Sequence, residues 1–392
     1  MKTRLALLLH VPALAATLAA AGCGDRVRDD DTLRIGAIVE MTGEMPAVGA
    51  SSRNAAELAV GVLNAAGGIT VAGKVYKVEL LVEDNAAKPD QSAAAANKLI
   101  TQDNVLAIVG PNASLGAIPA SEIAEASQTL LITPWSTNPK TTLDNRTGLP
   151  KKYVFRACFT DPFQGQVLAR FIMEKLGAKT AGVLYDVASE APKSQAELFR
   201  TTFEELGGSV VAFETYTTGD RDFSAQLTKI KSVNPDVVFL PAYYNDVGLI
   251  AQQARRQGID QPLVGSDAWS SPELIKLSEG AVEGAYFANH YAADIATPTA
   301  KKFIGAYQEK YGNPPDDVAA LTYDSFGLLF EALRSASAPE RQAVRDAMAT
   351  VSGYTGVTGE IRFSPGSGDP VKSAVIMQVK GDRFTWVMNA AP

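Results

Sequence analysis

The sequence predicts an α/β protein with two doubly wound lobes, each built on a parallel sheet that helices cover on both faces. Apolar runs of strand length alternate with segments whose apolar residues recur every three to four positions, which is the pattern of such sheets. This alternation occurs twice along the chain. The 392 residues also exceed the roughly 100–200 of one typical domain. We therefore expect two lobes with a cleft between them.

In the first half, expected strands and helices follow one another in turn. The strands cover residues 33–40, 75–84, 105–110 and 130–134. The helices cover residues 49–65, 89–103 and 116–127. The apolar face of the first helix consists of residues three to four positions apart, namely Ala55, Leu58, Ala59, Val62 and Leu63. Two glycines, Gly67 and Gly68, follow its expected end.

The second half repeats the alternation. Its expected helices cover residues 163–176, 192–207, 222–233 and 245–257. Its expected strands cover residues 181–186, 209–216, 236–242 and 262–268. Two long helices follow at residues 298–311 and 316–336, and the chain ends in strands at residues 360–364 and 373–387. The halves share the architecture without a residue-level repeat.

No low-complexity linker separates the two halves, so the chain should pass between the lobes in short crossover strands. We expect these crossovers near residues 153–159 and 285–291, where they would act as a hinge. The expected first lobe comprises residues 33–157 plus 288–364. The expected second lobe comprises residues 158–287 plus 365–392.

The composition argues against several classes of function. The net charge is -7 and no basic cluster is present, so we expect no nucleic-acid partner. The chain has two histidines, His10 and His290, which argues against a catalytic histidine constellation and a His-rich metal site. We expect no cofactor. It also lacks the GxSxG, HExxH and P-loop motifs, so we expect no enzyme. Cys158 has no partner for a disulfide within the mature chain, and no role is assigned to it.

Residues 1–23 have the pattern of an export signal. Lys2 and Arg4 precede an apolar stretch, and small residues lead up to Cys23. The ending AAGC resembles a bacterial lipobox, which implies that the sulfur of Cys23 is acylated and that cleavage leaves it at the N-terminus. The alternative is an ordinary signal peptide that contains a cysteine. We expect residues 24–32 to be a tether and the protein to lie in the periplasm or at the cell surface, anchored by lipid.

Several segments resemble the type I periplasmic binding proteins of the branched-chain amino-acid transport class. They are AIVEMTGEMPAVGASSRNAAELAVGVLNAAGGI, IVGPNASLGAIPASEIAE, LLITPWSTNPKTT, FRACFTDPFQGQVLA, PDVVFLPAYYNDVGLIAQQARRQG and VGSDAW. They occur in family order and span about residues 33–380. The resemblance implies two lobes joined by three crossovers, a small-molecule ligand in the cleft, and delivery to an ABC permease in the inner membrane. We expect a monomer.

The first lobe carries four candidate ligand-binding residues. Ser114 lies between an expected strand and helix, where the amides and the helix dipole favour an anion such as a carboxylate. The resemblance implies that Ser114 holds the ligand carboxylate and that Thr137 contacts both the carboxylate and the ammonium. It also implies that Trp135 offers its carbonyl to the ammonium, and Ser136 lies between these two. The alternatives are that Ser114 only caps its helix and that Trp135 only packs at the cleft rim.

The second lobe carries the remaining candidates. The resemblance implies that Asp267 pairs with the ligand ammonium and that Tyr243 contacts the ligand. A buried carboxylate of this kind would reject ligands that lack the amine, because it would be left unpaired. The alternatives are that Asp267 caps the following turn and that Tyr243 packs in the core or at the rim. We also expect Asp161 and Phe163 to face the cleft.

Two departures from the family pattern leave the side chain of the ligand open. Val48 stands where close relatives carry an aromatic lid, and Glu190 stands where they carry a tyrosine. Glu190 either favours a polar or cationic ligand side chain or belongs to a solvated loop. Two other functions remain open as well. One is a carrier for a carboxylate without an amine, such as an aromatic acid, for which Asp267 would be irrelevant. The other is the sensing domain of a receptor.

Overall fold

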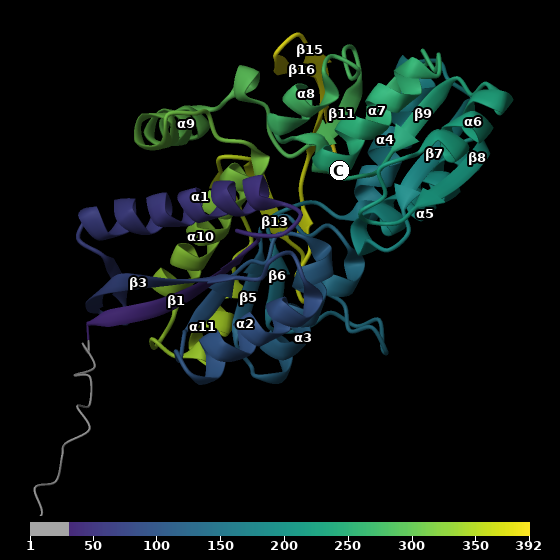
Figure 1. The fold of residues 1–392 in the computed structure, drawn as a ribbon. Coiled ribbons are helices and arrows are strands. Elements are labelled where there is room, and N and C mark those ends of the chain that lie inside the picture. The colour runs from purple at the N-terminus through teal and green to yellow at the C-terminus, as the bar shows by residue number, and fades with distance from the viewer. Residues whose placement is uncertain (1–30) are drawn as a thin grey trace, which may run out of the picture. The chain divides into compact units, whose positions relative to one another are not determined.

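The computed structural model describes residues 31–392, and the expected export signal, Cys23 and nearly all of the expected tether lie outside the described residues. Within the described part, two large sheets form separate lobes, and helices pack on both faces of each sheet (Figure 1). The predicted fold class is confirmed. No helix of the described part is long and apolar enough to cross a membrane.

The sheet of the first lobe has the strand order β2-β3-β1-β4-β5-β6. Its strands are β1 (Thr32–Val39), β2 (Ile69–Val71), β3 (Lys74–Asp84), β4 (Ala107–Val109), β5 (Leu130–Thr133) and β6 (Val154–Arg156). All neighbouring strands are parallel except β2, which forms an antiparallel hairpin with β3. Strand β6 lies within the crossover strand expected near residues 153–159, whereas the three-residue strand β2 was not among the expected strands.

Helices cover the two faces of this sheet in pairs. They are α1 (Pro46–Ala65), α2 (Pro89–Thr101), α3 (Ser114–Ala126), α10 (Asp317–Ser335) and α11 (Arg341–Met348). Helices α1 and α10 pack together, as do α2 and α3. In β1, Ile35 belongs to the core cluster that contains residues of α1 and α10, whereas Ile38 belongs to the cluster that contains residues of α2 and α3. Alternate side chains of one strand therefore serve opposite faces.

The sheet of the second lobe has the strand order β16-β15-β11-β10-β9-β7-β8. Its strands are β7 (Thr180–Asp186), β8 (Ser209–Tyr216), β9 (Val237–Leu240), β10 (Leu263–Gly265), β11 (Tyr286–Asn289), β15 (Ala374–Lys380) and β16 (Arg383–Ala390). Strands β7 to β11 run parallel, and the C-terminal hairpin β15-β16 adds antiparallel strands at one edge. The helices are α4 (Asp161–Lys175), α5 (Glu190–Glu205), α6 (Ser224–Val233), α7 (Tyr244–Arg256) and α8 (Glu273–Ser278).

The chain passes between the sheets at three short segments. They lie between β6 and α4 (residues 157–160), after β11 (from residue 290), and at residues 372–373 before β15. Strand β11 pairs along its whole length with β15 and through Tyr286 and Phe287 with β10, so the expected lobe boundary before residue 288 falls inside this strand. A small sheet of β12 (Tyr354–Gly356), β13 (Gly359–Phe363) and β14 (Pro370–Val371) precedes the third crossover, and α9 (Pro298–Tyr311) lies beside α1.

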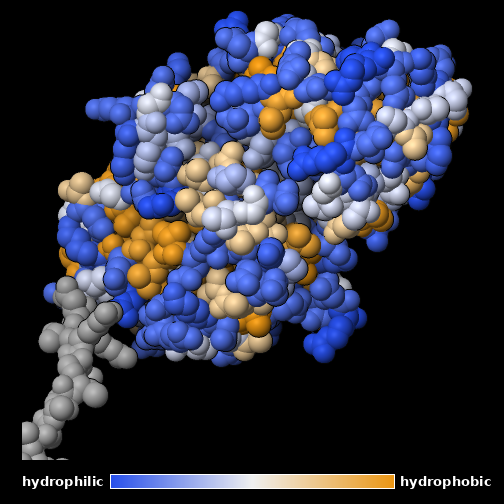
Figure 2. Space-filling view, viewed as in Figure 1, coloured by the Kyte–Doolittle hydropathy of each residue, from blue (hydrophilic) through white to orange (hydrophobic). Residues whose placement is uncertain are grey.

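The visible surface of residues 32–392 is mostly hydrophilic (Figure 2). A hydrophobic area lies on the first lobe near β3, whose residues Leu80, Leu81 and Val82 are half-buried. Large apolar side chains elsewhere are mostly buried in the cores of the lobes. This distribution is the usual one for a protein that folds around its own apolar cores.

Candidate ligand-binding site

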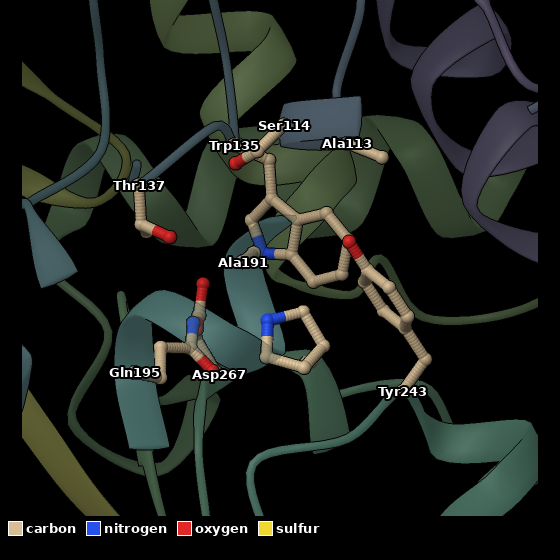
Figure 3. A pocket seen from close by; sticks show the side chains of 10 residues that line it. Ala113, Ser114, Trp135, Thr137, Ala191, Gln195, Tyr243 and Asp267 are labelled. Carbon is tan, nitrogen blue, oxygen red and sulfur yellow. The ribbon is translucent and has the colours of Figure 1, made fainter. Parts of the chain in front are cut away.

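A pocket lies between the two lobes, and both lobes contribute to its walls (Figure 3). It holds about 250 Å³ of unfilled space, part of it open to solvent. Its lining residues are Ala113, Ser114, Trp135, Thr137, Ala191, Pro192, Gln195, Tyr243, Asp267 and Ala268.

The pocket lies at the carboxyl ends of parallel strands in both sheets, where α/β proteins bind ligands. Residues after β4 and β5 form the wall of the first lobe, and residues after β7, β9 and β10 form the wall of the second lobe. Five predicted site residues line the pocket together, namely Ser114, Trp135, Thr137, Tyr243 and Asp267. The predicted residues Ser136, Asp161 and Phe163 are not among the lining residues.

The loop before Ser114 is held by a buried carboxylate of the first lobe. The Oε1 atom of Glu40 accepts hydrogen bonds from the backbone N–H groups of Asn112 and Ala113, at 3.1 and 3.2 Å. Its Oε2 atom accepts from Nδ2 of Asn112 at 2.8 Å. Burial raises the pKa of Glu40, and these hydrogen bonds partly offset that effect. Both amides are therefore already bonded within the protein, whereas Ser114 lines the pocket.

Ser114 is the first residue of α3, and the residue before it, Ala113, occupies the N-cap position without a side-chain cap. The alternative that Ser114 caps this helix is therefore not what the structure shows. The Oγ atom of Ser114 accepts a hydrogen bond from the Oγ atom of Ser136 at 2.9 Å. A serine hydroxyl that accepts one bond still has its hydrogen to donate. Ser114 can thus donate to a carboxylate at the N-terminus of α3.

Ser136 supports the pocket from behind. Besides the bond to Ser114, its hydroxyl lies 2.7 Å from the hydroxyl of Thr141, and its carbonyl accepts from the guanidinium of Arg156. The thiol of Cys158 donates to the same carbonyl at 3.2 Å, and burial raises the pKa of this thiol. These bonds fix the backbone between Trp135 and Thr137, although Ser136 itself does not line the pocket.

Asp161 is a fully buried carboxylate next to Thr137, whose carbonyl accepts from the backbone N–H of Asp161 at 2.9 Å. Neither carboxylate oxygen of Asp161 has a hydrogen-bond partner at normal geometry among the described residues. Burial raises its pKa to about 6, and the nearby side chains of Thr137, Ser194 and Gln195 lower it only in part. Phe163 instead packs against Phe159, with 5.8 Å between the ring centroids.

Asp267 is 2% exposed, and three side chains that sequence reasoning did not identify orient its carboxylate. Its Oδ1 atom accepts from Nε2 of Gln164 at 2.9 Å and from Nε2 of Gln195 at 3.4 Å. Its Oδ2 atom lies 3.1 Å from Nε2 of His290. Burial lowers the pKa of His290, so we assign the neutral ring with its proton on Nε2. All three neighbours are therefore neutral donors.

This environment argues against the use of Asp267 as a cap. The carboxylate is held in place, but no cation among these contacts neutralises it, and it lines the pocket. The residue at the N-cap of the following 3₁₀ turn is Ser266, and the turn has no side-chain cap. The side chain of Asp267 is thus available to a positively charged ligand group rather than used as a cap.

Trp135 is 5% exposed and forms a wall of the pocket. Its Nε1 donates to Oδ2 of Asp317 in α10 at 3.1 Å. The other oxygen of Asp317 accepts from the hydroxyl of Ser270, which belongs to the second lobe. Burial, and after it the neighbouring Asp316, raises the pKa of Asp317 well above its ordinary value. The ring of Tyr243 lies beside the indole, with centroids 6.1 Å apart.

The two departures from the family pattern lie outside the pocket lining. Val48 is 2% exposed and belongs to the core of the first lobe. Glu190, at the start of α5, pairs through Oε2 with Nζ of Lys140 at 2.7 Å, and its carbonyl accepts from Nδ2 of Asn138 at 3.1 Å. Lys140 and Asn138 belong to the first lobe. Glu190 therefore links the two lobes instead of facing the ligand space.

Two sheet lobes, short crossovers and a pocket that both lobes line define a two-lobed binding protein. The described residues contain no group of three or more His, Cys, Asp or Glu side chains placed to hold a metal ion. The chain belongs to the periplasmic binding protein family, whose model matches residues 32–383. This is a family of binding proteins, and the resemblance identified from the sequence is confirmed.

Similar proteins with assigned ligands match nearly the whole described chain. The leucine-, isoleucine-, valine-, threonine- and alanine-binding protein of Pseudomonas aeruginosa is 29% identical over 350 residues, which are 89% of this chain and 90% of the relative. The leucine binding protein of Thermotoga maritima has a TM-score of 0.85 at 35% identity and covers 92% of this chain and 99% of its own. The branched-chain amino acid binding protein of Streptococcus pneumoniae, solved with isoleucine, has a TM-score of 0.84 at 33% identity, covering 92% and 100%.

Proposed function

We propose that this chain captures an amino acid between its two lobes, outside the cytoplasm, and delivers it to the permease of an ABC importer. The observation that carries the proposal is that one pocket combines a site that favours a negatively charged group with a site that favours a positively charged group. Hydroxyl groups at a helix N-terminus favour an anion, and an oriented carboxylate without a cation favours an ammonium group. An α-amino acid presents both charges about one carbon apart.

The anionic end of the ligand is assigned to the first lobe. Ser114 and Thr137 line the pocket with hydroxyl groups, and Ser114 begins α3. The positive end of the helix dipole and the free amides of the first turn stabilise a carboxylate there. The family relationship supports the same assignment, because similar proteins bind amino acids at 29–35% identity.

The cationic end is assigned to Asp267 of the second lobe, with Asp161 as a second buried carboxylate nearby. Hydrogen bonds between charged partners are roughly twice as strong as neutral ones, and both carboxylates are shielded from water. Asp267 is held by neutral donors only, so an ammonium group would provide the missing positive charge. Binding at this site draws the two lobes together, because the two charged ends of one ligand contact different lobes.

The export signal and the anchor belong to the proposal as well. Acylation of Cys23 would hold the protein at the membrane, since each buried CH₂ contributes about 0.8 kcal/mol and several chains together anchor firmly. We expect a monomer that carries out no reaction. Replacing Cys23 with Ala should move the protein from the membrane fraction to the soluble periplasmic or culture fraction. A variant that stays in the membrane fraction would contradict the anchor.

A melting screen with matched ligands tests the assignment. Each candidate amino acid is compared with the carboxylic acid that lacks the amine and with the amine that lacks the carboxylate. A ligand that binds only the folded state raises the melting temperature in proportion to the logarithm of its concentration over Kd. We expect stabilisation by the amino acids alone. Equal stabilisation by the acids without an amine, including aromatic acids, would instead identify a carboxylate carrier.

A further inference from the structure

The walls of the pocket differ in chemistry from one side to the other. Thr137, Gln195 and Asp267 lie on one side, and the rings of Trp135 and Tyr243 lie on the other (Figure 3). A ligand whose ammonium group reaches Asp267 therefore directs its side chain toward the aromatic rings. The size of that side chain depends on the space that these rings leave.

The indole of Trp135 is held in its position by more than packing. Its Nε1 donates to Asp317, which is 1% exposed in the first turn of α10. Asp317 in turn accepts from Ser270 of the second lobe, so this chain of bonds connects the indole to both lobes. Moving the indole away would leave the buried carboxylate of Asp317 without one of its partners, which is costly. The indole consequently acts as a fixed wall when the lobes are together.

The remaining apolar lining cannot give way to a larger ligand. It consists of small side chains, namely Ala113, Ala191, Pro192 and Ala268. These residues have no rotatable side-chain bonds that could open additional space. Trp135 is by far the largest side chain among them, and its ring lies 6.1 Å from that of Tyr243. Enlarging the pocket therefore requires a change at Trp135 or Tyr243, or a change in how far the lobes close.

We propose that Trp135, positioned by Asp317, limits the size of the ligand side chain, so that this protein binds amino acids with small side chains more tightly than leucine and phenylalanine. The inference rests on the proposed function and narrows its substrate class. The indole sets the limit by occupying the space that a longer side chain would need. Asp317 acts through the indole, as a positioning residue.

Calorimetric titration of the wild type with glycine, alanine, threonine, valine, leucine and phenylalanine gives the first test. We expect leucine and phenylalanine to bind at least about tenfold more weakly than alanine, the discrimination that one or more methylene groups give in a closed pocket. Tighter binding of leucine than of alanine would overturn the inference and leave the amino-acid assignment intact. Absence of binding by every amino acid would overturn the assignment and this inference with it.

The Trp135→Ala variant gives the second test. We expect the ratio of the Kd for leucine to the Kd for alanine to fall by about tenfold or more. The matched control is Trp386→Ala, which removes a half-exposed tryptophan of β16 that does not line the pocket and should leave the ratio unchanged. The less drastic Trp135→Leu variant serves if the alanine variant does not fold. A ratio that stays at the wild-type value in a folded variant would overturn the inference.

Discussion

The charge of Asp267 can be removed with almost no change of shape by the substitution Asp267→Asn. In the proposed complex the ammonium group of the ligand bonds to this carboxylate in a water-poor pocket, where Asp267 is 2% exposed. A hydrogen bond to a charged group contributes about 1.5–3 kcal/mol. Since 1.4 kcal/mol corresponds to a tenfold change in Kd, we expect the Asn variant to bind its amino acid roughly 10- to 150-fold more weakly.

The same substitution should not weaken the ligand-free protein. Burial is the main cause of the raised pKa values of Asp161 and Asp317, and the negative charge of Asp267 raises both pKa values further. Ionised forms of these carboxyl groups would therefore repel one another. Removing one charge relieves that repulsion, and Nδ2 of the asparagine can donate to Nε2 of His290 once the ring carries its proton on Nδ1, so the melting temperature without ligand should equal or exceed that of the wild type. Loss of affinity together with unchanged or higher stability is typical of a residue kept for function.

Isothermal titration at neutral pH measures the affinity, and thermal unfolding without ligand measures the stability. The control is Asp382→Asn, which removes the same charge from an exposed turn between β15 and β16 of the same lobe. We expect the control to bind like the wild type. An Asp267→Asn variant that binds as tightly as the wild type would refute the ammonium assignment.

Three further predictions follow from charged groups around the pocket. Burial raises the pKa of Asp161 to about 6, so an incoming ammonium group should displace its proton, and the affinity for the ligand should rise between about pH 5 and 7. The released proton should make the binding heat differ between two buffers. The Asp161→Asn variant should flatten the dependence of affinity on pH. The pKa of His290 is lowered from 6.5 in the folded state, so the unfolded state takes up the proton at a higher pH, and the stability of the fold should fall as the pH drops below about 6.5. In unfolding measurements at several pH values, the His290→Gln variant should lose less stability at low pH. It should also bind the ligand more weakly, because His290 orients Asp267. The paired side chains of Lys140 and Glu190 are 53% and 38% exposed, respectively, so the Glu190→Gln variant should change the binding free energy of the ligand by less than about 1 kcal/mol. A larger change that persists in high salt would contradict this weak link between the lobes.

The position of the pocket could be predicted because it depends on local pattern. Ser114, Thr137, Tyr243 and Asp267 each follow an apolar run of strand length, and parallel strands place such residues at one edge of a sheet. The orientation of Asp267 could not be predicted. Its partners Gln164, Gln195 and His290 are 103, 72 and 23 residues away, on other elements, and no sequence period relates them.

The sequence by itself determined the fold class, the family and five of the residues that line the pocket from both lobes, since these follow from the periodicity of apolar residues and from short motifs at strand ends. Tertiary structure alone decided how those residues act. In the folded chain, Trp135 is hydrogen-bonded to Asp317 and forms a fixed wall. Glu190 pairs with Lys140 where the lobes meet, and the carboxylate oxygens of Asp161 have no hydrogen-bond partner among the described residues. The physical reason is that burial and hydrogen bonding depend on which elements the crossovers bring together. The pattern of residues along the sequence does not contain the distances in space between those elements.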